Sequence, residues 1–338
     1  MTTRKKRAIF YLVLILSVVG LYAWYVRGLS FERLFPFGQP KSAGDAEHGR
    51  WFSLAAAPTA RTEVGAAELS GKLYVVGGLD GLGQTLSKVE AYNPKTDRWE
   101  AVPDLPKALH HPSVVALEGY LYVLGGFQGL NFVPLNTVFV FDRITGIWQE
   151  VAPMPEARGG MAAAVYNGKI YVVGGDSPDG VSGALFSYSP AEDSWQILRS
   201  MPTARDHLSV AVLNDKLFVL GGRKKDLGKP LKTVEVYDFA SDGWASGESL
   251  PRGMAGGAAV LYRGGILAMG GEEIGRTRDE VHRFDPEKNK WENLTPMLSS
   301  RHGFGAAVIN DIIYTAAGGK HPSLSVSGIL ESMVFGGR

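Results

Sequence analysis

Short apolar runs dominate the hydrophobic pattern of the chain beyond its first fifty residues. The runs Leu73–Val76, Leu121–Leu124, Ile170–Val173 and Leu217–Leu220 are each followed by a Gly-Gly pair. Brief apolar runs that end at glycine are typical of buried β-strands, whereas a helix needs a longer periodic segment. The pattern therefore predicts an all-β domain built from many short strands.

The glycine pairs recur with a nearly constant period. They lie at Gly77-Gly78, Gly125-Gly126, Gly174-Gly175, Gly221-Gly222, Gly270-Gly271 and Gly318-Gly319, and subtraction gives intervals of 48, 49, 47, 49 and 48 residues. Five pairs are followed by a tryptophan, at Trp99, Trp148, Trp195, Trp244 and Trp291. An aromatic residue stands seven positions before each tryptophan, at Tyr92, Phe141, Tyr188, Tyr237 and Phe284. A period this regular indicates repeated supersecondary units, and rings in fixed register fill the space between neighbouring sheets.

Each period predicts four antiparallel strands, here named a to d. In the third unit they are Met161–Tyr166, Lys169–Val173, Ala184–Ser189 and Ser194–Leu198. Strands a and b are joined by dipeptides such as Asn167-Gly168, which tight hairpins prefer because they tolerate positive φ. Four such strands form one blade of a β-propeller.

Together, the Gly-Gly pair after a β-rich run, the spaced aromatic residue and the tryptophan resemble the kelch repeat. The resemblance covers Trp51 to about Phe335 and implies a six-bladed β-propeller. The sixth unit, with Arg301-His302-Gly303 before strand a and Pro322–Ser325 after its glycines, resembles that of a bacterial kelch subgroup. Kelch propellers typically close by pairing a strand from one terminus into the blade of the other, which removes open sheet edges.

The two ends of the repeat region predict how this propeller closes. The sixth unit ends before any tryptophan strand, with its strand c expected near Ile329–Phe335. A segment that resembles the tryptophan strand of a unit, Arg50–Leu54, precedes the first unit, and Trp51 precedes Trp99 by 48 residues. We therefore expect the N-terminal strand to complete the sixth blade.

The N-terminal segment predicts a membrane anchor. Basic residues occupy Arg4–Arg7, and the uncharged run Ala8–Val26 would be about 28 Å long as a helix, close to the hydrocarbon thickness of a bilayer. The positive-inside rule then sends the rest of the chain to the extracytoplasmic side, periplasmic or extracellular. A cleaved signal peptide remains the alternative, although the apolar run is long for one and Leu21–Ala23 is a poor cleavage site. The predicted organisation is a cytoplasmic tail at 1–7, a transmembrane signal anchor at 8–26, a linker at 27–49 and a propeller at 50–338.

Composition removes several classes of function. The chain has 35 Lys and Arg residues against 34 Asp and Glu residues, so its net charge of +1 gives no reason to expect nucleic acid as a partner. It has no cysteine, which excludes disulfides, thiolate metal sites and cysteine nucleophiles. Neither a phosphate-binding glycine-rich loop nor a hydrolase or metalloprotease motif occurs. We expect no cofactor and no metal.

The predicted topology brings charged residues together at one mouth of the propeller channel. The loops after each Gly-Gly pair and the residues before each strand a lie at the same end of a blade. The predicted ligand-binding residues at this mouth are Arg61, Arg158, Arg205, Arg301, Arg276, Glu272 and His207. Because the arginine fork matches carboxylates, an anionic ligand is expected. A structural role, in which the arginines bind only neighbouring backbone and carboxylates, remains open.

Four histidines, His110, His111, His207 and His302, also fall near this mouth. They follow no known metal-ligand spacing, so polar lining of the channel is the favoured interpretation. Neighbouring residues of a regular strand point to opposite faces, so His110 and His111 are not both expected to enter one site.

Two functions fit these observations. The first is a binding module for a peptide, protein or glycan, because the loops after the glycine pairs are too short to form a lid over a buried reaction. The alternative is an enzyme, since Gly256–Ala259, Gly271-Glu272 and Gly275–Thr277 resemble a blade of the bacterial sialic-acid epimerase (mutarotase). That resemblance implies Arg276 and Glu272 near a carboxylated sugar, with Glu63 or His207 as proton carriers.

Overall fold

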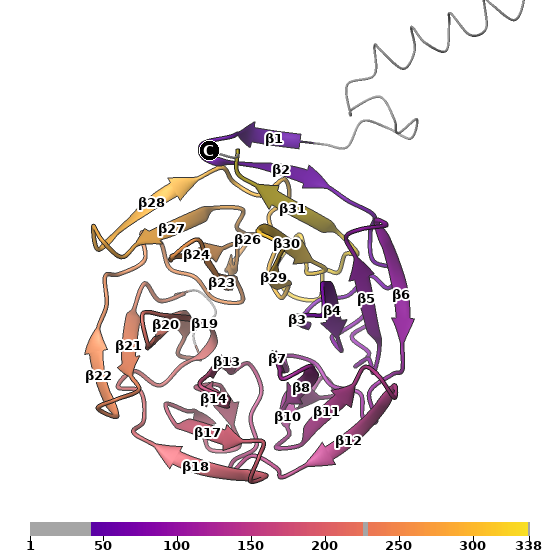
Figure 1. Ribbon diagram of the computed structural model, residues 1–338, viewed down its shortest axis with the longest axis vertical. Helices are drawn as coiled ribbons and strands as arrows, with labels where there is room; N and C mark the ends of the chain where they lie inside the picture. Colours follow the sequence, from indigo (N-terminus) through magenta and orange to yellow (C-terminus); the bar gives the residue numbers. More distant parts are fainter. Residues whose placement is uncertain (1–41, 226–228, 337–338) are drawn as a thin grey trace, which may run out of the picture. The chain divides into compact units, whose positions relative to one another are not determined.

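The computed structural model describes residues 42–225 and 229–336, which form a ring of antiparallel sheets (Figure 1). Their regular structure consists of β-strands, and none of these residues belongs to a helix of the length and apolarity that crossing a bilayer demands. The predicted span at residues 8–26, its preceding tail and most of the predicted linker lie outside the described residues. The all-β prediction is confirmed for the part of the chain that the structure describes.

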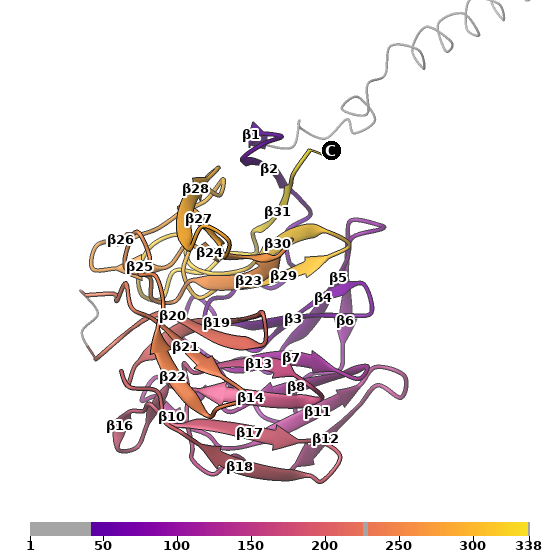
Figure 2. The same ribbon diagram turned by 60° about the vertical axis from the view of Figure 1, so that its left-hand side comes forward.

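Six blades surround the axis, each a four-stranded sheet apart from the last (Figures 1 and 2). The first three blades comprise β3 (Gly65–Leu69), β4 (Lys72–Val76), β5 (Val89–Asn93) and β6 (Arg98–Val102); β7 (Ser113–Leu117), β8 (Tyr120–Leu124), β11 (Val138–Asp142) and β12 (Ile147–Val151); and β13 (Ala162–Tyr166), β14 (Lys169–Val173), β17 (Leu185–Ser189) and β18 (Ser194–Leu198). The next two comprise β19 (Asp206–Leu213), β20 (Lys216–Arg223), β21 (Val234–Asp238) and β22 (Gly243–Ser246); and β23 (Ala258–Tyr262), β24 (Gly265–Met269), β27 (Val281–Asp285) and β28 (Lys290–Leu294). The sixth contains β29 (Gly305–Ile309), β30 (Ile312–Ala316), β31 (Leu330–Val334), β2 (Gly49–Ser53) and β1 (Ser42–Asp45).

The N-terminal strand closes the ring as predicted. Strand β2 pairs antiparallel with β31, and Trp51 lies opposite Met333. Strand β1 then pairs with β2 at the outer edge of the blade. The sheet therefore begins at Ser42, inside the 27–49 region that the sequence assigned to the linker.

Contacts between blades repeat around the ring. The indole N–H of Trp51 donates to the carbonyl oxygen of Thr295 on the neighbouring blade at 2.9 Å, and Trp99 donates in the same way to Ala55 at 2.8 Å. Tyr92 and Phe141, from the predicted aromatic column, are buried among apolar residues of adjacent blades. Aromatic burial between sheets therefore holds the blades together, as the repeat predicts.

Three small ribbons in the loops that follow Gly-Gly pairs were not predicted. They are β9 (Phe127–Gln128) with β10 (Val133–Pro134), β15 (Asp176–Ser177) with β16 (Gly180–Val181), and β25 (Glu272–Glu273) with β26 (Arg276–Thr277). Each gives its loop a fixed hairpin shape. They stiffen the mouth at which the sequence placed a binding site.

Candidate functional site

A ring of backbone hydrogen bonds surrounds the channel where the blades join. The residues that form it occupy equivalent positions in the six blades and all have positive φ: Glu63, His111, Gly160, His207, Gly256 and Gly303. Taken in this order, the backbone N–H of each of the last five residues donates to the backbone carbonyl oxygen of the residue named before it, at 2.8 to 3.1 Å. Val64 N–H donates to Gly303 O at 3.2 Å and completes the ring. The repeat thus places six equivalent residues around one axis.

Three of the six ring residues carry side chains in a conformation that favours glycine. Glu63, His111 and His207 have φ values of 54°, 54° and 52°. A left-handed backbone costs an ordinary L-residue about 1–2 kcal/mol. Residues with such a strained backbone are concentrated at functional sites, where the surrounding structure holds them in place. These three side chains converge, and one candidate ligand atom from each lies within 4.8 Å of the others.

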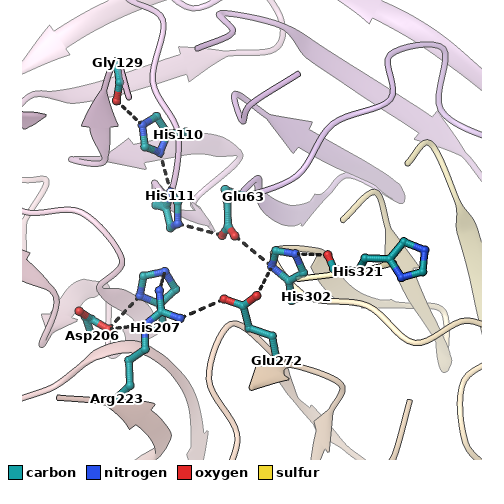
Figure 3. Close-up of polar contacts among 10 residues, drawn as sticks. All are labelled: Glu63, His110, His111, Gly129, Asp206, His207, Arg223, Glu272, His302 and His321. Atoms are coloured by element: carbon teal, nitrogen blue, oxygen red, sulfur yellow. Dashed lines mark hydrogen bonds and ion pairs between the residues drawn. The ribbon is translucent and has the colours of Figure 1, made fainter. Parts of the chain in front are cut away.

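Glu63 lies between two histidines (Figure 3). Its Oε2 is 3.0 Å from His111 Nε2, and its Oε1 is 3.1 Å from His302 Nδ1. The same His302 nitrogen lies 3.5 Å from Glu272 Oε2, and the other ring nitrogen donates to the His321 carbonyl oxygen at 3.0 Å. One carboxylate therefore links blades whose residues are far apart in the sequence.

His207 is held on the other side of the cluster by Asp206 and Arg223. Asp206 Oδ1 lies 2.9 Å from His207 Nδ1, and Arg223 Nη2 lies 2.9 Å from His207 Nε2. Arg223 also contacts Asp206 through Nε at 3.3 Å and Glu272 through Nη1 at 3.0 Å. Since the guanidinium group only donates, His207 Nε2 accepts, and its Nδ1–H donates to Asp206.

The charges of the cluster follow from burial and pairing. Burial opposes ionisation of Glu63, but His111 and the hydrogen bond from His302 hold the Glu63 pKa well below its ordinary value. Burial lowers the pKa of His111 well below that of a free imidazole. Burial also disfavours charge on His302, yet the hydrogen bond to Glu63 and the negative charges of Glu63 and Glu272 raise its pKa. Pairing thus favours an ionised Glu63 and favours protonation of His302, whereas burial opposes protonation of His111.

The cluster forms the floor of a cavity of about 450 Å³ at this mouth. Glu63, His111, His302, Arg223 and Glu272 contribute its polar lining. Its apolar lining comes from the loops after the glycine pairs and includes Leu130, Phe132, Ile274 and Leu324. The predicted sharing of one mouth by these loops and the residues before each strand a is confirmed.

The four arginines of the predicted column lie within the blades. Arg61, Arg158, Arg205 and Arg301 are fully buried. Each guanidinium pairs with a glutamate and donates to at least one backbone carbonyl oxygen. The glutamates are Glu90, Glu235 and Glu331 on the third strand of the same blade, and Glu156 in the segment between β12 and β13. This geometry supports the structural role that the sequence left open. The expectation of an anionic ligand rested mainly on these arginines, and their guanidinium groups already pair with glutamates.

The other predicted site residues lie at the mouth in different positions. Glu272 lines the cavity, and His207 packs against His111 with ring centroids 4.9 Å apart. Arg276 lies on the β26 ribbon, where its side chain is exposed and its Nε is 2.6 Å from Glu273 Oε1. Glu63 was predicted only as a possible proton carrier, and Arg223 was not among the predicted ligand-binding residues, although both line the cavity.

His110 and His111 do not share the cavity. His111 lines it, whereas His110 lies behind, with its Nδ1 2.6 Å from His111 Nδ1 and its Nε2 3.1 Å from the Gly129 carbonyl oxygen. As predicted, only one of the two rings lines the cavity, but the two side chains do not point apart, because their ring centroids are 4.8 Å from each other. The backbone is not a regular strand here, because His111 has positive φ.

Comparisons with known proteins agree with the repeat pattern. The KLHDC2/KLHL20/DRC7 kelch-repeats domain matches residues 44–175 and 153–319. Human Kelch-like protein 34 is 31% identical over 101 residues, which are 28% of this chain and 16% of that protein. Alpha-scruin of Limulus polyphemus is 32% identical over 115 residues, 32% of this chain and 12% of that protein. The chain therefore matches less than a fifth of the length of these relatives.

A solved structure shares the architecture. The structure titled "Structure of YjhT" aligns with a TM-score of 0.71 over 81% of this chain and 95% of that chain, at 18% sequence identity. At this identity the match shows the fold alone.

Proposed function

Because this chain belongs to the kelch-repeat family, we propose that it is a protein-interaction module that binds a segment of a partner protein at the mouth containing the cavity. Kelch propellers generally serve as protein-interaction modules. The observation that carries the proposal for this chain is an exposed apolar rim around a polar floor.

The rim is formed by large apolar side chains that the fold leaves in solvent. The loops after the glycine pairs expose Leu130, Phe132, Ile274 and Leu324, and all four line the cavity. Leu130 is 55% exposed and Ile274 is 73% exposed. Exposed apolar side chains that gather around one cavity and are bordered by polar groups are typical of protein-binding sites. Exposed apolar residues without such a role are usually scattered singly over the surface. A partner segment would gain by burying these side chains.

The floor supplies specificity. Glu63, Glu272 and Arg223 present fixed charges to the cavity, and the residues that hold them are themselves hydrogen-bonded. A partner side chain that enters must replace water at these groups with matching hydrogen bonds, or lose affinity. We infer a partner segment with apolar residues for the rim and one polar residue for the cavity.

Peptide selection tests this proposal. A phage-displayed library of random peptides is selected on the full chain, and the recovered peptides are measured against Phe132→Ser and Ile274→Ser. Loss of one apolar contact at the centre of an interface should weaken binding at least about tenfold. Ile197→Ser is the matched control, because Ile197 is 71% exposed but lies on the outer strand β18. Peptides that bind the rim variants and the parent equally would place the binding surface elsewhere.

The enzyme suggested by the sequence has one observation in its favour. The cavity contains an ionised carboxylate and a histidine with raised pKa in contact, which is an arrangement suited to proton transfer. Epimerisation or ring opening of an acidic sugar by the full chain, abolished in Glu63→Gln, would favour this alternative over the docking module.

We also propose that residues 8–26 anchor the propeller to a membrane and leave it on the extracytoplasmic side. The support is the length of the uncharged run and the basic residues before it. A reporter that works only outside the cytoplasm, fused after Arg338, should be active, and the chain should stay with membranes after a carbonate wash. Release of the propeller as a soluble species cut near Ala23 would identify a signal peptide instead.

A further inference from the structure

A series of polar contacts runs from the Gly129 carbonyl oxygen through His110 and His111 to Glu63 (Figure 3). With both histidines neutral, one contact of this series has no proton to share. Starting at the Gly129 carbonyl oxygen, which only accepts, His110 Nε2–H must donate, so His110 Nδ1 accepts from His111 Nδ1–H. His111 Nε2 then carries a lone pair, yet it lies 3.0 Å from Glu63 Oε2. Two acceptors at this distance repel unless a proton or another cation lies between them.

A third donor atom lies beside this pair. His207 places a ring nitrogen within 4.8 Å of the Glu63 and His111 ligand atoms. Three ligands bound to one zinc-like ion at ordinary bond lengths are about 3.4 Å apart, so small side-chain rotations would bring all three onto one cation. The backbone ring supports this convergence, because it holds all three residues at equivalent positions around the axis.

We propose that Glu63, His111 and His207 bind a divalent transition-metal cation of the zinc class. Two imidazoles and one carboxylate are a donor set that such ions prefer, whereas Mg²⁺ and Ca²⁺ prefer oxygen ligands. Glu63 and His111 line the cavity, so a bound cation would be accessible to an incoming ligand from that side. This inference does not depend on the proposed protein partner.

Residues around the three ligands are arranged to support a metal. Asp206 accepts the Nδ1–H of His207, and His110 contacts the ring nitrogen of His111 that faces away from Glu63. Partners of this kind fix the orientation of ligating histidines.

Arg223 is the competing cation. Its Nη2 donates to His207 Nε2 at 2.9 Å and so occupies a lone pair that a metal would use. The guanidinium keeps two further partners, Asp206 and Glu272, when that bond is lost. Removal of Arg223 should therefore strengthen metal binding, a gain that misfolding cannot produce.

The test is a titration of the full chain, stripped of metal with a chelator, with Co²⁺ and then with Zn²⁺ as competitor. We expect one Co²⁺ per chain with visible absorption bands of a low-coordinate site, displacement by Zn²⁺, and no displacement by Mg²⁺. Glu63→Gln, His111→Ala and His207→Ala should each weaken Co²⁺ binding at least about tenfold. Arg223→Gln should tighten it.

His321→Ala is the matched control, because its exposed ring lies outside the ligand set and only its backbone oxygen contacts the cluster. It should bind Co²⁺ as the parent does. Failure of the parent chain to bind one Co²⁺, or binding that is unchanged in both His111→Ala and Arg223→Gln, would overturn the proposal. The missing charge between His111 and Glu63 would then be a proton.

Discussion

Replacing Trp51 by alanine should lower the free energy of unfolding of the propeller by about 3–5 kcal/mol, the usual cost of truncating a buried tryptophan. Trp51 is fully buried, packs with Met333 and Phe304 between the first and last parts of the chain, and donates its indole N–H to Thr295. The cavity left behind would open the contact by which β2 completes the sixth blade. Chemical denaturation followed by circular dichroism measures the change.

Trp148→Ala is the matched control for closure. Trp148 makes the same type of bond, to the Pro103 carbonyl oxygen at 2.9 Å, but it is half-buried and lies in a blade formed by consecutive strands. Trp148→Ala should lower the free energy of unfolding clearly less than Trp51→Ala does. Equal effects of the two substitutions would mean that the N-terminal strand has no special role in holding the ring together.

The blade architecture was predictable because one unit recurs with little variation. In the third unit, strands b and d match the prediction at both ends, and strands a and c begin one residue later than predicted. Hydrophobic alternation and tight-turn dipeptides fix such strands locally, and the repeat averages out local ambiguity. The short ribbons at the mouth were missed because two-residue strands carry no periodic signal.

The role of the arginines could also be predicted from the sequence, because three units pair an arginine with a glutamate at a fixed spacing. Where the position before strand a is Arg61, Arg205 or Arg301, the second residue of strand c is glutamate: Glu90, Glu235 and Glu331. The unit with Leu109 has Phe139 there, and the unit with Met254 has His282. Arg158 instead stacks on Phe186 at 4.2 Å and pairs with Glu156. Charges that vary together within a repeat indicate an internal pair.

A similar comparison of units identifies the cluster. The residue two positions after that column is glycine in three units, at Gly160, Gly256 and Gly303, which signals a left-handed backbone. The remaining units carry Glu63, His111 and His207 at the same position. A side chain where the repeat prefers glycine is a sign of function. The hydrogen-bond partners of these residues were not predictable, since they depend on loops from other blades.

Arg301→Ala should lower the free energy of unfolding by about 3–5 kcal/mol, the cost of leaving one partner of a buried ion pair uncompensated. Arg301 Nη2 is 2.9 Å from Glu331 Oε2, with side-chain exposures of 0% and 2%. Its Nη1 donates to the carbonyl oxygens of Ala317 and Ile329 at 3.1 and 3.2 Å. The substitution would leave both the buried carboxylate and these carbonyl oxygens without a hydrogen-bond donor, because alanine supplies none.

Two further variants separate a buried structural pair from a ligand-binding arginine. The double variant Arg301→Ala with Glu331→Gln removes the uncompensated charge and should be more stable than Arg301→Ala alone, since much of the loss comes from that carboxylate. Arg276→Ala should change stability by less than about 0.5 kcal/mol, because its side chain is exposed at the mouth. If Arg301 instead serves a ligand, Arg301→Ala would keep the stability of the parent and lose affinity for peptides selected on the full chain.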